Sequence, residues 1–528
     1  MKMRFLITCF TAILFSGEIL AQNAPQVTTQ NGVLEGVDSS GVKIFKGVPF
    51  AAPPVGALRW KAPQPVKNWQ GVRKATEYGP NPMQENVFGD MDFGTPKMSE
   101  DCLYLNIWTP AKTMKEKLPV VIYFNGGGLM AGSGSEPRYA GLTMARRGIV
   151  AVTANYREGI FGFFAHPQLS KETTYKGSGN YGFLDQVAAL KWLKENIAAF
   201  GGDPDHITVA GESAGSMSVS ILMASPLAKG LFQQAIGSSG SVMGFKKLPT
   251  LKEAEQMGVE QAKKMGFKNI SDLRALPAEK LMKLASVHSV PVYNLDSYFM
   301  SEQPVDVYAK GAQAQVPLLV GGNSLEMPIA FILGKNPATL GMIKAFARPI
   351  FGNRTDEVLN LYGLKSDADV LKTPGDLFSN DNFIAYSTWK WSNLHQKTTS
   401  QPVYRYLYCH PRPDMVVKDK VAGLAGGVQD AKGQAPQPKL NGAVHSADIE
   451  YAMGNLPTNR VYDWQPEDYY VNFIKTGNPN GLGLPEWVPI NGKAVPEVLQ
   501  IDVNTVEKTD PEMENRYHVI DSIIYGNK

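Results

Sequence analysis

The segment HITVAGESAGSMSVSILMAS (206–225) constrains the fold more than any other part of the chain. It begins with a strand-like run, passes through Gly-x-Ser-x-Gly and continues with a helix-like run. A strand and a helix can follow one another this closely only through a sharp, strained turn. Gly211 and Gly215 remove the side chains that would clash across that turn, so Ser213 is lifted out of the backbone. The segment therefore predicts a strand–turn–helix unit with this serine at its apex.

Strand-like and helix-like segments alternate before this unit. LPVVIYF (118–124) and GIVAVTANY (148–156) have the Val- and Ile-rich composition of buried parallel strands. Residues 181–200 place apolar side chains at steps of three and four, which predicts a helix with one apolar face. Alternation of this kind predicts an α/β fold, with a mostly parallel sheet and helices on both faces.

The middle of the chain departs from this alternation. Residues of about 245–310 and 328–400 contain amphipathic helical segments, and we interpret them as helical insertions. PLLVGGN (317–323) and PVYRYLY (402–408) return to a strand-like composition. Neither an internal repeat nor a linker divides the sequence, so we expect residues 22–528 to form a single domain.

The N-terminus is typical of an export signal. Lys2 and Arg4 precede a short apolar stretch, and Ala21 offers a small-residue cleavage point. The stretch is shorter than the roughly 20 apolar residues of a bilayer span, so we favour a cleaved signal over residues 1–21 to an uncleaved anchor. No second apolar run of spanning length follows. We expect an exported protein, periplasmic or secreted, without a stable membrane span.

Composition excludes several classes of function. The formal net charge is +3 over 528 residues and no basic run stands out, so nucleic acid is not an expected partner. The three cysteines, Cys9, Cys102 and Cys409, are too few for a disulfide scaffold or a thiolate metal cluster. The seven histidines show neither HExxH nor another paired-ligand spacing, so we expect no metal site.

Ser213 imposes a chemical requirement on the rest of the chain. A serine hydroxyl is a weak nucleophile that needs a histidine base, which in turn needs an orienting acid. Where the serine occupies such a turn, the acid and then the histidine follow downstream. Glu326 comes just after a strand-like segment, and His445 lies on a glycine-rich loop, so this pair is the best placed to reach the carboxyl edge of the sheet. The other downstream acids and histidines are less well placed.

A second glycine-rich stretch, IYFNGGGLMAGSG (122–134), follows the first strand-like segment. A Walker phosphate loop would require Gly-Lys-Ser/Thr, which is missing. The letters fit a dinucleotide fingerprint only if alanine is accepted at its end, and the serine turn downstream argues against that interpretation. The glycines are better explained as backbone that must approach closely the tetrahedral carbon formed when the serine attacks a carbonyl group. The N–H of Ala214, at the start of the next helix, is a further outward-pointing donor.

Two longer stretches carry a family resemblance. FGGDPDHITVAGESAG (200–215) resembles the serine signature of the type-B carboxylesterase/cholinesterase family, within the α/β-hydrolase superfamily. EDCLYLNIWTP (100–110) resembles the second signature of that family. NYREGIFGF (155–163), GNYGFLDQ (179–186) and GAVHSAD (442–448) extend the resemblance over most of the chain. It implies an α/β-hydrolase fold with helical insertions over the active site.

The resemblance also implies roles for individual residues. Three residues match the catalytic triad of the family: Ser213, Glu326 and His445. Three backbone N–H groups match its oxyanion hole: those of Gly127, Gly128 and Ala214. Together they imply a serine carboxylesterase that cleaves small-molecule carboxylic esters through an acyl-enzyme, with neither cofactor nor metal.

Other motif residues are expected to support the fold. By the family pattern, Arg59 pairs with Glu100 and Arg157 pairs with Asp185. GSSGSV (237–242) resembles a family stretch near the active site, and its serines are expected to give packing support rather than to act as second nucleophiles.

The sequence departs from the family pattern at three positions. Asn125 precedes the glycine triplet, where many family esterases have histidine. Cys102 lacks its usual disulfide partner, because Pro82 stands where that cysteine would fall, so we expect a free thiol. Met327 replaces the glycine that usually follows the acid, and a bulkier residue there is expected to bear on the loop of Glu326.

Three alternative functions remain open. Adhesion proteins related to this family have lost the nucleophile or the base, and the filled triad positions disfavour that interpretation. A lipase or sterol esterase is the second alternative, because the Met- and Phe-containing insertions would suit a lid or an apolar gorge. Release of aryl acids from plant polymers is the third. The sequence indicates neither the natural ester nor the oligomeric state.

Overall fold

The computed structural model describes residues 24–526, with the exception of 289, 414, 418, 424–426, 431–439 and 457–466. The expected export signal, residues 1–21, lies outside the described residues. Within the described part of the chain, no helix is both long enough and apolar enough to cross a membrane.

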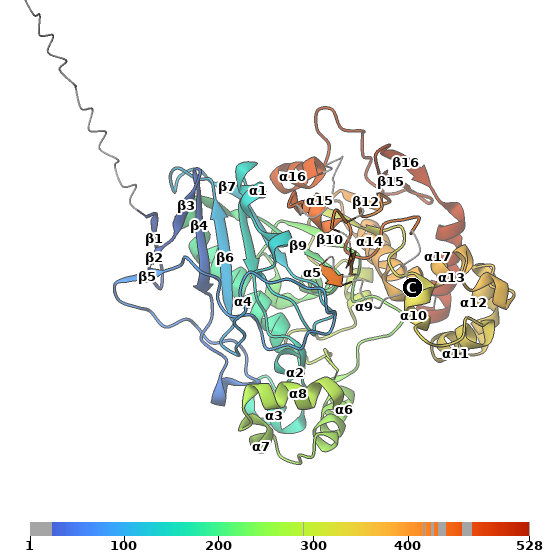
Figure 1. Ribbon diagram of the computed structural model, residues 1–528, viewed down its shortest axis with the longest axis horizontal. Helices are drawn as coiled ribbons and strands as arrows, with labels where there is room; N and C mark the ends of the chain where they lie inside the picture. The colour runs from blue at the N-terminus through green and yellow to red at the C-terminus, as the bar shows by residue number, and fades with distance from the viewer. Residues whose placement is uncertain are drawn as a thin grey trace, which may run out of the picture.

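A mixed sheet of eleven strands runs through the centre of the described structure (Figure 1). Seven neighbouring strands are parallel and lie in this order: β15 (Glu497–Ile501), β12 (Val403–Tyr408), β11 (Leu318–Asn323), β10 (Gln234–Ser238), β9 (Gly202–Glu212), β7 (Leu118–Phe124) and β8 (Val150–Ala154). Antiparallel strands flank them: β16 (Val506–Thr509) at one edge, and β6 (Tyr104–Thr109), β4 (Val42–Pro49) and β3 (Val37–Ser39) at the other. Two small sheets lie apart from it: β1 (Gln26–Thr29) with β2 (Gly32–Glu35) and β5 (Val72–Lys74), and β13 (Lys420–Ala422) with β14 (Val428–Asp430). The predicted α/β fold with a mostly parallel sheet is confirmed.

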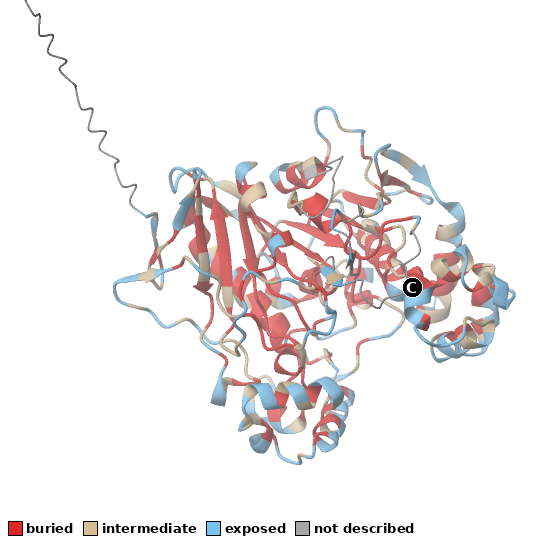
Figure 2. Ribbon diagram, viewed as in Figure 1, coloured by how far each residue is buried: buried red, intermediate tan, exposed pale blue. Residues whose placement is uncertain are grey.

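Helices cover both faces of the large sheet. Those outside the two middle segments are α1 (Leu142–Arg146), α2 (Gly159–Gly162), α3 (Pro167–Glu172), α4 (Tyr181–Asn196), α5 (Ala214–Ala224), α15 (Ile449–Met453), α16 (Glu467–Thr476) and α17 (Pro511–Tyr525). Successive side chains of β7 divide between the two faces, as the strand repeat requires. Val120, Ile122 and Phe124 share a core with α4 and α5, whereas Val121 and Tyr123 share another with α15 and α16. The central strands are therefore buried on both sides (Figure 2).

The two middle segments, which we interpreted as insertions, are built from helices. Between β10 and β11 lie α6 (Leu251–Lys264), α7 (Ile270–Arg274), α8 (Ala278–His288) and α9 (Pro304–Ala309). Between β11 and β12 lie α10 (Ile329–Leu333), α11 (Leu340–Phe351), α12 (Thr355–Leu361), α13 (Thr373–Asn380), the π-helical turn η7 (Asp381–Ala385) and α14 (Tyr386–Thr398). Figure 1 shows α6, α7 and α8 gathered with α3 in one lobe, where Leu169, Ala262, Leu273 and Leu281 belong to one small core. The other insertion lies on a different side of the sheet (Figure 1).

Helix α4 is buried more extensively than its periodicity predicts. The expected apolar face, represented by Phe183 and Val187, is buried. Side chains next to this face, including Leu184, Asp185 and Trp192, are buried as well. The predicted apolar face is therefore confirmed, and burial extends beyond it because β9, α2 and α5 pack around the helix, while Lys191 and Glu195 remain exposed.

Both ion pairs that the resemblance implied are present. The Nε and Nη2 groups of Arg157 donate to Asp185 at 2.8 and 2.7 Å, and both side chains are buried. The Nε group of Arg59 donates to Glu100 at 2.6 Å, and its Nη1 donates to the carbonyl of Leu276, between α7 and α8. The first pair holds α4 to the loop after β8. The second orients Arg59, whose hydrogen bond to Leu276 joins the N-terminal region to the first insertion.

Asp185→Ala should destabilise the protein strongly, because it leaves the buried guanidinium of Arg157 without its carboxylate. We expect the free energy of unfolding to fall by about 3–5 kcal/mol, measured by urea denaturation. Asp205→Ala is the matched control, since Asp205 forms an ion pair with Lys194 while its own side chain is 84% exposed. Equal losses in the two variants would contradict a structural role for the buried pair.

Candidate active site

Ser213 alone connects strand β9 to helix α5. Strand β9 ends at Glu212, helix α5 begins at Ala214, and Ser213 adopts φ 55° and ψ −121°. A positive φ is rare for a residue with a side chain, and it persists only where the surroundings enforce it. The N–H of Ser213 donates to the carbonyl of Ser238 in β10 at 2.9 Å, which ties the turn to the neighbouring strand. The predicted strained turn is confirmed.

The glycines on either side of Ser213 are required by close backbone approaches. A Cβ atom on Gly211 would lie 2.5 Å from the carbonyl carbon of Gly215. A Cβ atom on Gly215 would lie 2.1 Å from the carbonyl oxygen of Phe124, the last residue of β7. Any side chain at either position would push β9, α5 and β7 apart. The turn therefore requires glycine at both positions for steric reasons, as the sequence predicts.

The glycine triplet after β7 lies directly against the serine turn. A Cβ atom on Gly126 would lie 3.0 Å from the Cβ of Ser213. Gly127 and Gly128 follow with φ values of 106° and 66°, in the left-handed region that favours glycine. Within the described residues, the N–H groups of Gly127, Gly128 and Ala214 donate to no protein acceptor. Three uncommitted backbone donors therefore come from the two segments that meet at the serine.

Glu326 and His445 meet although they are 119 residues apart in sequence. Nδ1 of His445 lies 2.8 Å from Oε2 of Glu326, and the His445 backbone N–H donates to the Glu326 carbonyl at 3.0 Å. The other carboxylate oxygen of Glu326 accepts from the Asn323 N–H and from the Ser239 hydroxyl, each at 2.6 Å. The fully buried carboxylate is thus held by three donors, and the support expected from the 237–242 segment is supplied by Ser239.

The second nitrogen of His445 faces the serine turn. Its Nε2 lies 3.2 Å from Oε1 of Glu212, the residue before Ser213. The hydroxyl of Ser213 makes no hydrogen bond with any described residue, and contacts of this kind are often long before a substrate binds. The ring of Phe383, on η7, packs edge-on against the imidazole at 4.9 Å between centroids.

Carboxylates surround the imidazole and change its titration. Burial on its own would lower the pKa of His445, but the charge of Glu212 and the hydrogen bond to Glu326 outweigh burial and raise this pKa above 6.5. Burial raises the pKa of Glu212, and the nearby Asp448 raises it further, although His445 opposes the shift. Both groups therefore hold their protons more tightly than they would in water. His445 loses its proton only at a pH above its ordinary pKa of 6.5.

The departures at positions 125 and 327 are both accommodated. Asn125 is buried and its Nδ2 group donates to the carbonyl of Gly126 at 2.9 Å and to Oε1 of Glu158 at 3.0 Å. The N–H of Met327 donates to Oδ1 of Asn380 at 3.0 Å, at the end of α13. We expected the bulkier Met327 to bear on the loop of Glu326. The Glu326 carboxylate nevertheless keeps its hydrogen bonds to Ser239, Asn323 and His445.

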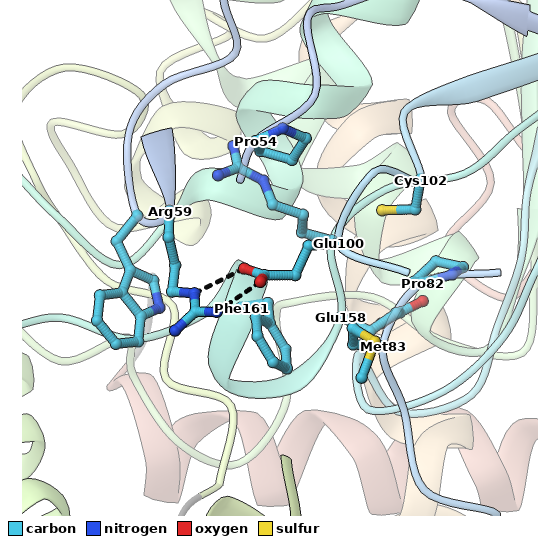
Figure 3. Close-up of a pocket in the computed structure, with 10 residues that line it drawn as sticks. Pro54, Arg59, Pro82, Met83, Glu100, Cys102, Glu158 and Phe161 are labelled. Atoms are coloured by element: carbon cyan, nitrogen blue, oxygen red, sulfur yellow. Dashed lines mark hydrogen bonds and ion pairs between the residues drawn. The ribbon is translucent and has the colours of Figure 1, made fainter. Parts of the chain in front are cut away.

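Both described cysteines are free, as we expected for Cys102. Cys102 is buried, and burial raises the pKa of its thiol well above the ordinary value. Figure 3 shows it beside a small cavity that Pro82 also lines, which is where the partner cysteine would have been expected. Cys409 is also unpaired, and burial raises the pKa of its thiol to about 11.

Sequence reasoning missed several groups around the triad. Glu212 ends the buried part of β9, residues 207–212, and an acid at a buried strand end is an unusual signal that the sequence did offer. Asp448 accepts from Asn323 Nδ2 at 3.2 Å and from the Tyr406 hydroxyl at 3.0 Å. Glu158, which contacts Asn125, was also missed. Only its place just before the apolar run of residues 160–163 could have drawn attention to it.

Comparisons with known proteins agree with this geometry. The chain matches the sequence profile of the carboxylesterase family over residues 23–520. It is 38% identical to the fumonisin B1 esterase of Sphingopyxis macrogoltabida, over 82% of this chain and 75% of that protein. It is 32% identical to the para-nitrobenzyl esterase of Bacillus subtilis (strain 168), over 94% of this chain and 98% of that protein.

Solved structures give the same result for the fold. A carboxylesterase of Geobacillus stearothermophilus superposes with a TM-score of 0.78 at 29% identity, covering 94% of this chain and 99% of that one. A PNB esterase superposes with a TM-score of 0.76 at 30% identity, covering 93% and 98% of the two chains. The chain therefore belongs to the carboxylesterase family and has the α/β-hydrolase fold.

Proposed function

We propose that this carboxylic ester hydrolase is a serine carboxylesterase that works through Ser213, His445 and Glu326 and through an acyl-enzyme. The observation that carries the proposal is the buried Glu326–His445 hydrogen bond of 2.8 Å, whose histidine presents its other nitrogen to the strained serine turn. The glycine backbone beside Ser213 supports the same chemistry, because it presents uncommitted donors where negative charge would develop.

The proposed reaction begins when the Ser213 hydroxyl attacks the ester carbonyl while Nε2 of His445 takes its proton. Glu326 keeps Nδ1 protonated and stabilises the imidazolium that forms. The tetrahedral oxyanion accepts hydrogen bonds from the backbone donors at Gly127, Gly128 and Ala214, each worth about 3–4 kcal/mol of barrier. The alcohol leaves with the proton of His445, and water activated by His445 then releases the acid from Ser213.

Ser213→Ala should abolish the burst of p-nitrophenol from a p-nitrophenyl ester, because no acyl-enzyme can form. We expect kcat to fall on the order of 10⁶-fold, measured by stopped-flow absorbance. Ser241→Ala is the matched control, since that buried hydroxyl bonds the carbonyl of Ser387 and makes no contact with His445. A full burst in Ser213→Ala would refute the proposed nucleophile.

The pH dependence of kcat/KM should report the carboxylates around the base. His445 accepts the serine proton only when neutral, and its pKa is raised, so we expect kcat/KM to rise with pH with a midpoint above 6.5. Glu212→Gln removes the charge that contributes most to this shift, and the midpoint should move towards lower pH. Glu514→Gln, which alters a buried carboxylate paired with Arg405, should leave the midpoint in place. An unchanged midpoint in Glu212→Gln would contradict this account.

Two exposed aromatic side chains support an ester with apolar groups. Phe383 packs against His445, and the Cζ atom of Phe88 would lie 3.9 Å from a Cβ atom on Gly128. Phe383 and Phe88 are 38% and 37% exposed, which is unusual for large apolar residues beside a buried charged site. The name of the para-nitrobenzyl esterase relative suggests aromatic esters as the first substrates to test.

The same aromatic side chains are also compatible with the lipase or sterol esterase alternative, and kinetics separates the two functions. A carboxylesterase should follow ordinary saturation with p-nitrophenyl butyrate through and beyond the concentration at which the ester aggregates. Phe383→Ala should raise KM for the butyrate several-fold more than for the acetate, because the longer acyl chain loses more apolar contact. A jump in rate on aggregation would favour the lipid-surface enzyme instead.

A further inference from the structure

A buried carboxyl group without a cation lies behind the glycine triplet. Glu158 precedes helix α2 and is fully buried. Its Oε1 accepts from Nδ2 of Asn125 at 3.0 Å, whereas its Oε2 has no hydrogen-bond partner among the described residues. Oδ1 of Asn125 is likewise buried without a partner. Two orphan oxygen atoms therefore belong to two side chains that already contact each other.

One proton would satisfy both orphan atoms. An ionised carboxylate and an amide oxygen are both acceptors, so neither can pair with the other. A protonated carboxyl group has an O–H donor, and it can form a reciprocal pair with an amide. In that pair the Asn125 N–H donates to one oxygen of Glu158, and the Glu158 O–H donates towards Oδ1 of Asn125. The observed 3.0 Å contact is the first half of this arrangement.

The surroundings of Glu158 favour the neutral acid. Arg59, Glu100, Cys102 and Arg157 line the same small cavity (Figure 3), but Arg59 is paired with Glu100 and Arg157 with Asp185. Neither cation forms an ion pair with Glu158. Burial raises the pKa of Glu158 well above 4.5, and the hydrogen bond from Asn125 offsets that rise only in part.

Asn125 connects this acid to the backbone beside Ser213. The same Nδ2 group that contacts Glu158 donates to the carbonyl of Gly126 at 2.9 Å. That carbonyl shares one planar peptide unit with the N–H of Gly127, and in a trans peptide the two point in opposite directions. Holding the carbonyl on one side therefore aims the N–H on the other. The Tyr156 hydroxyl holds the preceding peptide in the same way, through the carbonyl of Asn125 at 2.9 Å.

We propose that Glu158, as a neutral carboxylic acid paired with Asn125, orients the Gly127 N–H donor and is thus a positioning residue for the oxyanion hole. The inference rests on the proposed esterase function, in which that N–H binds the tetrahedral oxyanion. Glu158 itself touches no reacting atom. It acts through the amide of Asn125, which would otherwise be free to turn its oxygen towards the carbonyl of Gly126.

Three variants test this role on the full-length enzyme. Glu158→Gln keeps one acceptor and one donor in the same shape, so it should retain kcat within about twofold. Glu158→Leu and Asn125→Leu each break the pair, and each should lower kcat about tenfold or more with little change in KM. The double variant should lose little beyond either single variant, because both act through one element. Full activity in Glu158→Leu would overturn the proposal.

A second readout separates positioning from a loss of packing. Inhibition by a trifluoromethyl ketone, which forms a tetrahedral adduct, should weaken in Glu158→Leu by the same factor as kcat/KM. Asn294→Leu is the matched control, because it removes a buried amide that bonds the carbonyl of Ser178. It should leave both quantities unchanged even if it destabilises the protein. Weakened inhibition in the control, or unaltered inhibition in Glu158→Leu, would contradict a positioning role.

The protonation of Glu158 can be tested without any assay of activity. A carboxyl group with a raised pKa in the folded state contributes stability that is complete below its unfolded pKa and is lost as pH rises through the folded value. The thermal midpoint of the wild type should therefore fall relative to Glu158→Gln as pH rises above 4.5. A constant difference would show that Glu158 is already ionised and would overturn the proposal.

The outcomes also separate this proposal from the esterase proposal. A burst that persists in Ser213→Ala would overturn both. A burst that is lost in Ser213→Ala, together with unaltered kcat in Glu158→Leu, would overturn the role of Glu158 alone. If Glu158→Leu does not fold, kcat and inhibition in Asn125→Leu test the positioning role, and the pH dependence of the thermal midpoint in Glu158→Gln tests the protonation.

Discussion

The rest of the structure depends on the strained turn at Ser213. A single residue with positive φ redirects the chain from β9 into α5. The turn is sterically feasible only because Gly211 and Gly215 have no side chains, so their backbones can pack against each other. The contact of Gly215 with the carbonyl of Phe124 extends the constraint to β7. The pairing of β9 with β7, the start of α5 and the glycine loop after β7 are therefore coupled by close backbone contacts. None of them can shift without moving the others.

The parallel strands explain why distant segments converge at this turn. The glycine loop follows β7, Ser213 follows β9 and Glu326 follows β11, and the carboxyl ends of parallel strands share one edge of a sheet. His445 comes from a loop rather than from a strand end. Its place is set by two bonds to Glu326, one from the backbone and one from the imidazole. Glu326 thus fixes both the backbone and the imidazole of His445.

Much of this arrangement could be predicted from the sequence, because its causes are local. The turn needs glycine at fixed offsets from the serine, and buried parallel strands have a composition of their own. The apolar face predicted for α4 is buried, but the additional burial of Asp185 and Trp192 depends on neighbours that periodicity cannot reveal. The contacts Glu212–His445 and Asn125–Glu158 join segments that are distant or separated by a strand. Their effect on protonation depends on depth of burial, which the sequence does not encode locally.

The unpaired Cys102 bears on how the loop beside Gly128 is held. No covalent crosslink closes the loop that begins near Pro82, and backbone bonds between Asn81 and the 97–99 segment close it instead. That loop carries Phe88, whose ring lies near Gly128. The loop that carries Phe88 therefore folds without forming a disulfide. Substitutions in it can be explored in a reducing host, without a thiol partner to preserve.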